Sequence, residues 1–371
     1  MHFTYRFVLS DVRLPTEPAI GFDQFEQISR MVESEFSVED KLLELGMPTF
    51  YVKIGENSKE AFLRLIDKLD AIKFTPLLRR VGERTVLRVT PKSQTRPSRP
   101  VINIILLIAT IGTTFFSGYL LFLGLKGYVD LDPYIGAVEF TVAILAILGA
   151  HEMGHKLTSN RRKIEATYPY FIPGIPPIGT FGAVIQQKSL SPNKDALFDL
   201  GASGPVIGFI VAVVVTAIGV LLSPLVPESQ LPSNTASISV PLLFELLEIA
   251  LVKAPAVSGS YSMLLHPVAF AGWVGMLITT LNMLPTGMLD GGHTVRSLLG
   301  ERLRWVLTFL SLALLLAFGY WLMFFLVLFF SFVKHPGPLD DVSKLSTGRK
   351  LFALFLIAIF VLCLTPLESI F

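Results

Sequence analysis

Two histidines and a glutamate with a fixed spacing stand near the middle of the chain, in the segment Ala-His-Glu-Met-Gly-His-Lys at residues 150–156. In a helix, residues four apart lie on one face, so His151 and His155 can both direct a ring nitrogen at one metal ion such as zinc. Glu152 lies beside that metal, where it can take a proton from a bound water and later give one to a leaving amine. The spacing therefore indicates metal-assisted hydrolysis, although three fixed positions also occur together by chance.

The surroundings of this segment favour the metal site over coincidence. The segment ends an apolar run that begins near Ile135. An ionisable side chain inside a membrane costs about 2.5 kcal/mol or more, so three of them within five residues need a compensating partner. A bound metal ion is the simplest such partner.

A zinc site built on two histidines needs a third protein ligand, because catalytic zinc sites combine three protein ligands with one open position. Asp290 is the best candidate, since Pro285 breaks the helix before it and Gly291 and Gly292 permit close approach of the backbone. Two alternatives stay open. In the first alternative, Asp290 is an acidic loop residue at the membrane edge and binds no metal. In the second, His293 is the third ligand.

The composition describes a polytopic membrane protein rather than a soluble enzyme. Of the 371 residues, 52% are hydrophobic and 16% are charged, and the mean hydropathy is +0.61. A net charge of +2 argues against a nucleic-acid partner, and the single Cys363 excludes an internal disulfide framework. The first residues resemble neither a secretory signal nor a transit peptide.

Residues 1–92 are predicted to form a small soluble α+β domain, because their acidic and basic residues balance and no apolar run there is long enough to cross a membrane. Hydrophobic periodicity predicts strands at 3–14, 49–54, 74–80 and 84–90 and helices at 23–36 and 58–72. Gly82 suits a hairpin turn between the last two strands. A stiff, basic, proline-rich linker follows at 93–100, and residues 101–371 form the transmembrane domain.

The transmembrane domain is predicted to contain six or seven helices. The apolar runs that predict them are 101–124, 135–157, 198–223, 267–284, 303–333 and 351–364. The run 303–333 exceeds the roughly 20 residues that cross a bilayer, so it is either one tilted helix or two helices that fold back near Gly319 and Tyr320.

Positive charge favours the second alternative for this run. Two helices at 303–333 place the basic loops near residues 161–163, 296–304 and 344–350 on the same side as the basic linker. We therefore expect seven crossings of a prokaryote-like cell membrane, with the N-terminal domain in the cytoplasm and the C-terminus outside. Under this topology His151, His155 and Asp290 all lie near the cytoplasmic ends of their helices.

Residues 168–187, between the second and third spans, are too rich in proline and glycine for a helix and too apolar for an ordinary loop. They predict a re-entrant segment that packs against protein or water. A strand at 180–186 could pair its free edge with a substrate held extended at the metal, whereas an interfacial plug without substrate contact is the alternative. The residues expected to bind substrate are Gly179, Thr180, Phe181 and Gly182.

The motif His-Glu-Met-Gly-His at 151–155, followed by Asn282-x-x-Pro285-x-x-x-Leu289-Asp290-Gly291, resembles the site-2 protease family of intramembrane zinc metalloproteases. The resemblance extends from about residue 101 to the C-terminus. The added N-terminal domain, with His-Pro pairs at 266–267 and 335–336, is similar to the plant plastid EGY branch and its prokaryotic relatives.

The resemblance implies a Zn²⁺ cofactor with His151, His155 and Asp290 as ligands and Glu152 as general base. It also implies that the substrate is a transmembrane segment of another protein, cleaved within the lipid bilayer, and that Asn282 lies near the metal. The Asn282 amide could hold the substrate backbone or a developing oxyanion, or it could form an interhelical hydrogen bond. The expected function is an intramembrane endopeptidase. The alternatives are a catalytically idle scaffold or chaperone, which would need the zinc ligands but no Glu152, and a transporter.

Overall fold

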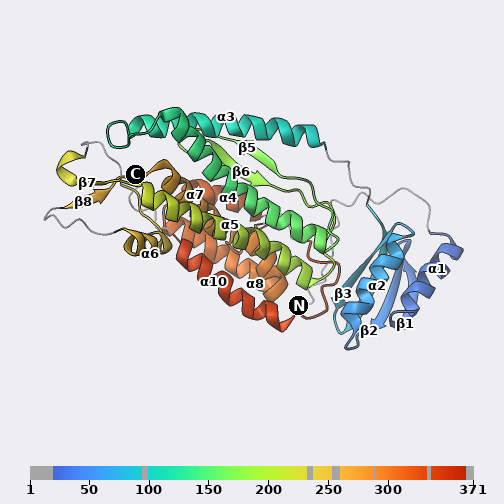
Figure 1. Ribbon diagram of the computed structural model, residues 1–371. Coiled ribbons are helices and arrows are strands. Elements are labelled where there is room, and N and C mark those ends of the chain that lie inside the picture. The colour runs from blue at the N-terminus through green and yellow to red at the C-terminus, as the bar shows by residue number, and fades with distance from the viewer. Residues whose placement is uncertain are drawn as a thin grey trace. The chain divides into compact units, whose positions relative to one another are not determined.

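The chain divides into two compact units, Met1–Ser93 and Gln94–Phe371, and each is described here by itself. The computed structural model describes residues 20–93, 99–231, 237–252, 260–287, 289–331 and 336–364 (Figure 1). The predicted strand at 3–14 and most of the predicted linker at 93–100 lie outside the described residues.

The first unit is a four-stranded antiparallel sheet with two helices. Its elements are α1 (Phe22–Glu33), β1 (Ser37–Glu44), β2 (Met47–Lys53), α2 (Ser58–Asp70), β3 (Phe74–Val81) and β4 (Arg84–Pro91), with strand order β1-β2-β4-β3. Both predicted helices and the three predicted strands that fall on described residues are confirmed. Strand β1 was not predicted, because this charged and largely exposed edge strand lacks a clear alternation of apolar residues.

The core of this unit lies between the helices and the sheet. Phe62 and Leu65 of α2 are fully buried together with Phe50 of β2 and Leu87 of β4. At the end of α1, the Glu35 carboxylate accepts hydrogen bonds from Arg64 and Lys68 of α2. Burial alone would raise the pKa of Glu35, but these two cations hold it below its ordinary value. The link between the two helices therefore stays charged near neutral pH.

The second unit is a helical bundle with two short antiparallel strand pairs among its described residues. Its helices are α3 (Pro100–Gly124), α4 (Pro133–Arg161), α5 (Lys194–Leu222), α6 (Leu242–Leu251), α7 (Pro267–Asn282), α8 (Asp290–Ala317), α9 (Trp321–Ser331) and α10 (Thr347–Cys363). Strands β5 (Tyr170–Pro173) and β6 (Thr180–Val184) form one antiparallel pair, and β7 (Leu225–Pro227) and β8 (Tyr261–Met263) form another. A 3-10 turn, η1, covers Glu228–Gln230.

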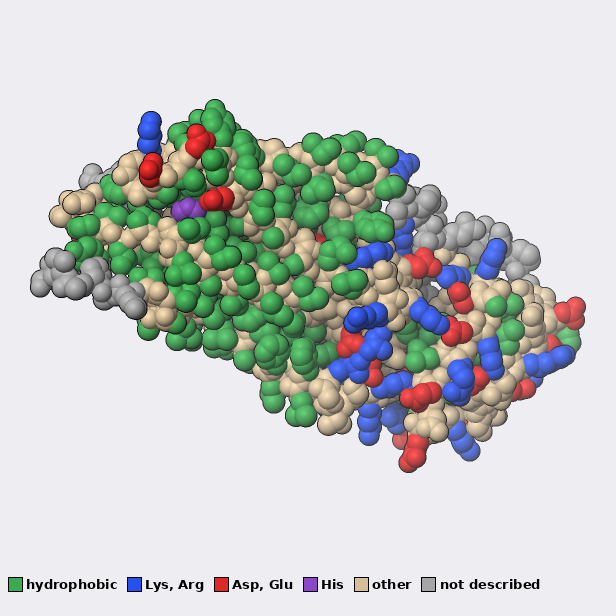
Figure 2. Space-filling view, in the orientation of Figure 1, with side chains coloured by type: hydrophobic (Ala, Val, Ile, Leu, Met, Phe, Trp, Pro, Cys, Tyr) green, Lys and Arg blue, Asp and Glu red, His purple; other side chains and the backbone are tan. Residues whose placement is uncertain are grey.

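Three of the described helices, α3, α4 and α5, are long and apolar enough to cross a membrane, and α7 is a shorter apolar helix. These four correspond to the first four predicted spans. Hydrophobic side chains cover much of the visible face of the second unit (Figure 2), as expected for a surface in contact with lipid. A total of six or seven spans stays a prediction.

The predicted run 303–333 is interrupted where the sequence suggested a fold-back. Helix α8 ends at Ala317, α9 begins at Trp321, and Gly319 between them has a positive φ of 74°. Leu312 of α8 and Val327 of α9 belong to one buried cluster with Leu284, so α9 packs back toward the end of α7. Helix α8 begins earlier than predicted and is itself kinked at Gly300.

The core of the second unit brings α4, α5 and α7 together. Ile147 of α4, Ala212 of α5 and Met276 of α7 are almost completely buried in one apolar cluster. Gly275 of α7 packs against both Ile147 and Ala212, and a Cβ atom there would lie 2.9 Å from the Ile147 side chain and 3.1 Å from the Ala212 side chain. Helix α4 is thus held between two partners, and His151, Glu152 and His155 on its second half are buried.

Candidate metal centre

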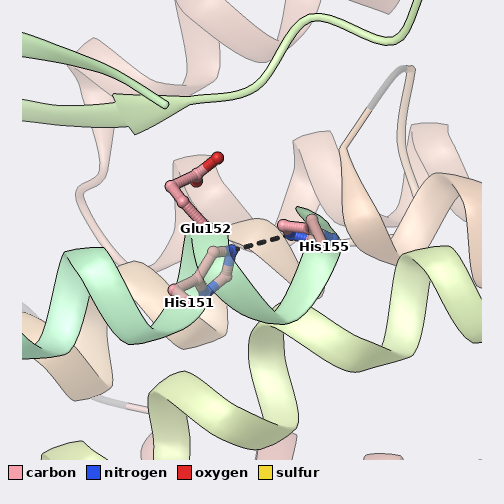
Figure 3. Close-up of side chains that lie close together, drawn as sticks. All are labelled: His151, Glu152 and His155. Carbon is pink, nitrogen blue, oxygen red and sulfur yellow. Dashed lines mark hydrogen bonds between the residues drawn. The ribbon is translucent and has the colours of Figure 1, made fainter. Parts of the chain in front are cut away.

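Helix α4 positions the two predicted histidines and the glutamate. It begins at Pro133, where the carboxylate of Asp132 caps the first turn, and it continues without interruption to Arg161. His151, Glu152 and His155 are only 4%, 5% and 5% exposed, and atoms from the three side chains lie within 4.8 Å of one another. The predicted spacing on one helical turn is therefore present in a buried environment (Figure 3).

Asp290 joins the two histidines from the start of α8. Its Oδ2 atom lies 3.1 Å from Nε2 of His151 and 3.3 Å from Nε2 of His155, and the two Nε2 atoms are 3.2 Å apart. Ligand atoms about 2.0–2.1 Å from a tetrahedral zinc ion are about 3.3–3.4 Å from each other. The three atoms thus form a triangle whose size fits one face of a zinc coordination sphere.

Glu152 is the other carboxylate near the histidines, and the two carboxylates differ in how closely they approach the imidazole nitrogens. A carboxylate oxygen of Glu152 lies within 4.8 Å of both histidines, whereas Oδ2 of Asp290 lies 3.1 and 3.3 Å from their Nε2 atoms. Figure 3 shows Glu152 extending from α4 away from the paired imidazoles. The geometry therefore favours Asp290 as the third ligand and leaves the Glu152 carboxylate free for another role.

The segment between α7 and α8 delivers Asp290 by close backbone contacts. A Cβ atom at Gly291 would lie 2.0 Å from the carbonyl oxygen of Met283, so only glycine fits there. The backbone N–H of Leu289 donates to the carbonyl of Thr286, which closes the turn before α8. The close approach of Gly291 to Met283 explains why a glycine is needed next to Asp290, as the sequence predicted.

Helix α5 supports the centre in a way that the sequence analysis did not anticipate. The carbonyl of Leu200 can only accept a hydrogen bond, so Nδ1 of His155 carries the proton that it donates across 2.9 Å. Nε2 of His155 is then the nitrogen with a free lone pair, as a metal ligand requires. A Cβ atom at Gly204 would lie 2.0 Å from this Nε2, so the absence of a side chain makes room for the ring.

The sequence feature that could have indicated this contribution of α5 is a row of glycines on one face of the third span. Gly201, Gly204 and Gly208 recur at intervals of three and four residues, and they face Asp290, His155 and His151 respectively. A hydrogen bond to a backbone carbonyl has no side-chain signature, so Leu200 itself could not have been identified.

Asn282 and His293 occupy different positions relative to the triangle. Nδ2 of Asn282, the last residue of α7, lies 3.4 Å from Nε2 of His151. His293 is 9% exposed and lies on the first turn of α8, whereas the three atoms of the triangle come from His151, His155 and Asp290.

The β5–β6 hairpin lies next to Glu152. Strand β6 contacts α4, and the backbone of Ile185, directly after β6, lies close to the Glu152 carboxylate. Thr180 is buried, and its hydroxyl donates to Ile172 and accepts from the Gly182 backbone, so it stabilises the hairpin itself. Phe181 is 66% exposed, and Gly179 lies against α3. The four residues predicted to bind substrate therefore differ in accessibility.

Comparison with known proteins defines the class to which this arrangement belongs. Residues 139–326 match the family model described as peptidase family M50, and the chain belongs to this family. The matched region contains both histidines, Glu152, the hairpin, Asn282 and Asp290. The resemblance to the site-2 protease family is thereby confirmed, and no solved structure matches the chain.

Several similar proteins carry the name probable zinc metalloprotease, chloroplastic. EGY1 of Arabidopsis thaliana is 32% identical over 249 residues, which cover 64% of this chain and 44% of that protein. EGY2 of the same plant is 33% identical over 202 residues, covering 52% and 34%. EGY3 of Oryza sativa subsp. indica is 27% identical over 293 residues, covering 70% and 47%. The chain thus spans less than half the length of these relatives.

Proposed function

We propose that the chain is a zinc-dependent endopeptidase that cleaves transmembrane segments of other membrane proteins within the bilayer. The observation that carries this proposal is the triangle of His151, His155 and Asp290, with Glu152 beside it on the same buried helix. Membership of peptidase family M50 and the names of the EGY relatives support the same activity.

The three triangle residues would hold the zinc ion. Bound zinc would polarise the peptide carbonyl and increase the acidity of a water molecule at the open position. The hydrogen bond from His155 to Leu200 fixes the ring orientation, which keeps its Nε2 atom directed at Asp290 and His151. The surrounding glycines of α5 allow the helices to approach closely enough to exclude bulk solvent.

Glu152 would act as general base and then as general acid. Its carboxylate would take a proton from the attacking water and later transfer it to the amine of the leaving peptide. Nδ2 of Asn282 lies 3.4 Å from Nε2 of His151, and from this position the amide could donate to the substrate carbonyl. An interhelical hydrogen bond without substrate contact remains the alternative role of Asn282.

The β6 strand would hold the substrate in an extended conformation. Within the described residues β6 pairs only with β5, and its other edge offers backbone groups next to Glu152. The backbone groups in the interior of a substrate helix are all paired within the helix, so the helix would have to unwind locally before pairing with this edge. Gly179, Thr180, Phe181 and Gly182 would bind the substrate mainly through the hairpin that they build.

We further propose that the protein crosses a cell membrane seven times, with a cytoplasmic N-terminal unit. Part of the basic charge behind this topology is neutralised locally, since Arg296 pairs with Asp341 and the fully buried Arg304 pairs with Glu301. The exposed Arg161, Lys163 and Lys350 still support the same orientation.

The topology can be tested with reporters fused to each end of the chain. We expect a reporter after residue 371 to be active only when it functions outside the cytoplasm, and a reporter at the N-terminus only when it functions inside. The break at Gly319 is the structural reason, because it allows α8 and α9 to lie in opposite directions. A C-terminal reporter active only in the cytoplasm would mean that 303–333 crosses the membrane once.

A catalytically idle scaffold or chaperone is the second candidate function. It would use the same zinc ligands, but it would not need a carboxylate at position 152. Co-expression with a library of tagged single-span proteins distinguishes the two functions. We expect shortened products with the wild-type chain that disappear with Glu152→Gln, whereas identical product patterns for both chains would contradict the proteolytic function.

A further inference from the structure

Helix α3 has a polar stripe along an otherwise lipid-like surface. Its exposed residues include Val101, Ile104, Ile105 and Ile108, but polar residues at intervals of seven, four and three positions on the opposite face are buried. The buried members of this stripe are Asn103, Thr110, Thr114 and Ser117. Such side chains are unfavourable in a membrane helix unless their polar groups form hydrogen bonds, either within the helix or with other parts of the protein.

Asn103 fixes the start of the β5–β6 hairpin. Its side-chain nitrogen donates to the carbonyls of both Tyr168 and Pro169, each at 2.8 Å. Both neighbours are acceptors, so the amide nitrogen must face them and both of its hydrogens are used. The segment that leads into β5 is therefore attached to α3 by a side chain that is only 9% exposed.

Thr113 fixes the turn of the same hairpin. Its hydroxyl lies 2.7 Å from the carbonyl of Gly179, closer than the two carbonyls of its own helix, at 3.2 Å each. Gly179 has a φ of 79°, and a Cβ atom there would lie 2.6 Å from the Thr113 carbonyl oxygen. The turn and the helix thus meet backbone to backbone at a position that only glycine can occupy.

The opposite side of the hairpin faces the catalytic helix. Strand β5 packs on α3, whereas β6 approaches α4, and the backbone after β6 contacts Glu152 through Ile185. The aromatic ring of Phe171 in β5 lies near Gly149 of α4. The hairpin therefore lies between α3 and α4 (Figure 1), and its position relative to Glu152 depends on the two contacts with α3.

We propose that Asn103 and Thr113 are positioning residues that set the place of the β6 edge relative to Glu152. They lie ten positions apart on α3, or about 15 Å along the helix. Two fixed points at this separation prevent the hairpin from sliding or tilting, so a substrate paired with β6 presents its peptide bond at the metal. This inference rests on the proposed proteolytic function and on substrate pairing with β6.

Thr113→Val tests the proposal, with Thr110→Val as the matched control. Both substitutions replace a threonine of α3 by an isosteric residue, but the Thr110 hydroxyl donates only to Leu106 of its own helix. With full-length chain in lipid vesicles, we expect Thr113→Val to lower kcat roughly five- to tenfold while zinc content is unchanged. Thr110→Val should leave kcat unchanged, and Thr113→Ser should restore it by returning the donor.

Amide hydrogen exchange provides a readout that does not depend on catalysis. Exchange at residues 180–185 should become faster in Thr113→Val and in Asn103→Leu, and it should stay at the wild-type rate in Thr110→Val. Equal exchange and equal kcat in Thr113→Val and Thr110→Val would overturn the positioning role. If the wild-type chain cleaves no substrate, the proposed function fails, and the exchange data still decide whether α3 holds the hairpin.

Discussion

Glu152→Gln is expected to keep nearly one zinc ion per chain and to lose proteolysis by at least about 100-fold, the usual size of general acid–base catalysis. Glutamine has almost the same shape as glutamate but cannot accept and return a proton. The proposed zinc ligands are His151, His155 and Asp290, so this substitution leaves all three proposed ligand atoms in place. Zinc content and cleavage should therefore separate.

Glu139→Gln is the matched control for this prediction. It makes the same change on the same helix, about 20 Å along α4 from Glu152, and Glu139 is not part of the metal-binding group. Metal content measured on the purified chain and cleavage of a membrane substrate are the two observables. Loss of zinc together with activity in Glu152→Gln would show that Glu152 is needed for the structure of the centre.

Asp290→Ala is expected to remove both zinc and activity. Asp290 supplies the only described carboxylate oxygen within 3.3 Å of both imidazole nitrogens, and two histidines alone leave zinc under-coordinated. His293→Ala should have a smaller effect, roughly 10- to 100-fold, because His293 lies three residues after Asp290 on α8 and is not one of the three proposed ligands.

The order of these two effects decides the identity of the third ligand. Zinc content and cleavage should be measured on both variants at the same protein concentration, with folding checked by helical circular dichroism. A chain with His293→Ala that loses its metal, beside a chain with Asp290→Ala that retains metal and activity, would establish a three-histidine site.

The residues of the centre that could be predicted from the sequence are those marked by a pattern in the residues around them. His151 and His155 lie on one face because the helical repeat requires it, and the apolar run around them predicted a buried helix. Asp290 is far away in sequence, but the helix-breaking proline and the adjacent glycines marked its position. The structure brings these three residues together as the coordination chemistry of zinc suggested.

The supporting contacts could not be predicted because they depend on how helices pack. The carbonyl of Leu200 orients His155 without any side-chain signature, and Gly204 resembles any other glycine in an apolar span. Thr113 could equally have bonded only to its own helix, as Thr110 does. The number of basic residues that can orient the chain in a membrane could not be predicted fully either, because the ion pair of the buried Arg304 with Glu301 depends on the fold.

Zinc K-edge X-ray absorption on the purified full-length chain tests the central claim most directly. The account predicts one zinc ion per chain, with two imidazole nitrogens and additional oxygen ligands at about 2.0–2.1 Å. The contribution of the two imidazoles should persist in Glu152→Gln, and Asp290→Ala should lose the metal. A spectrum that requires three imidazoles, or a purified chain that binds no zinc, would contradict a centre built from His151, His155 and Asp290.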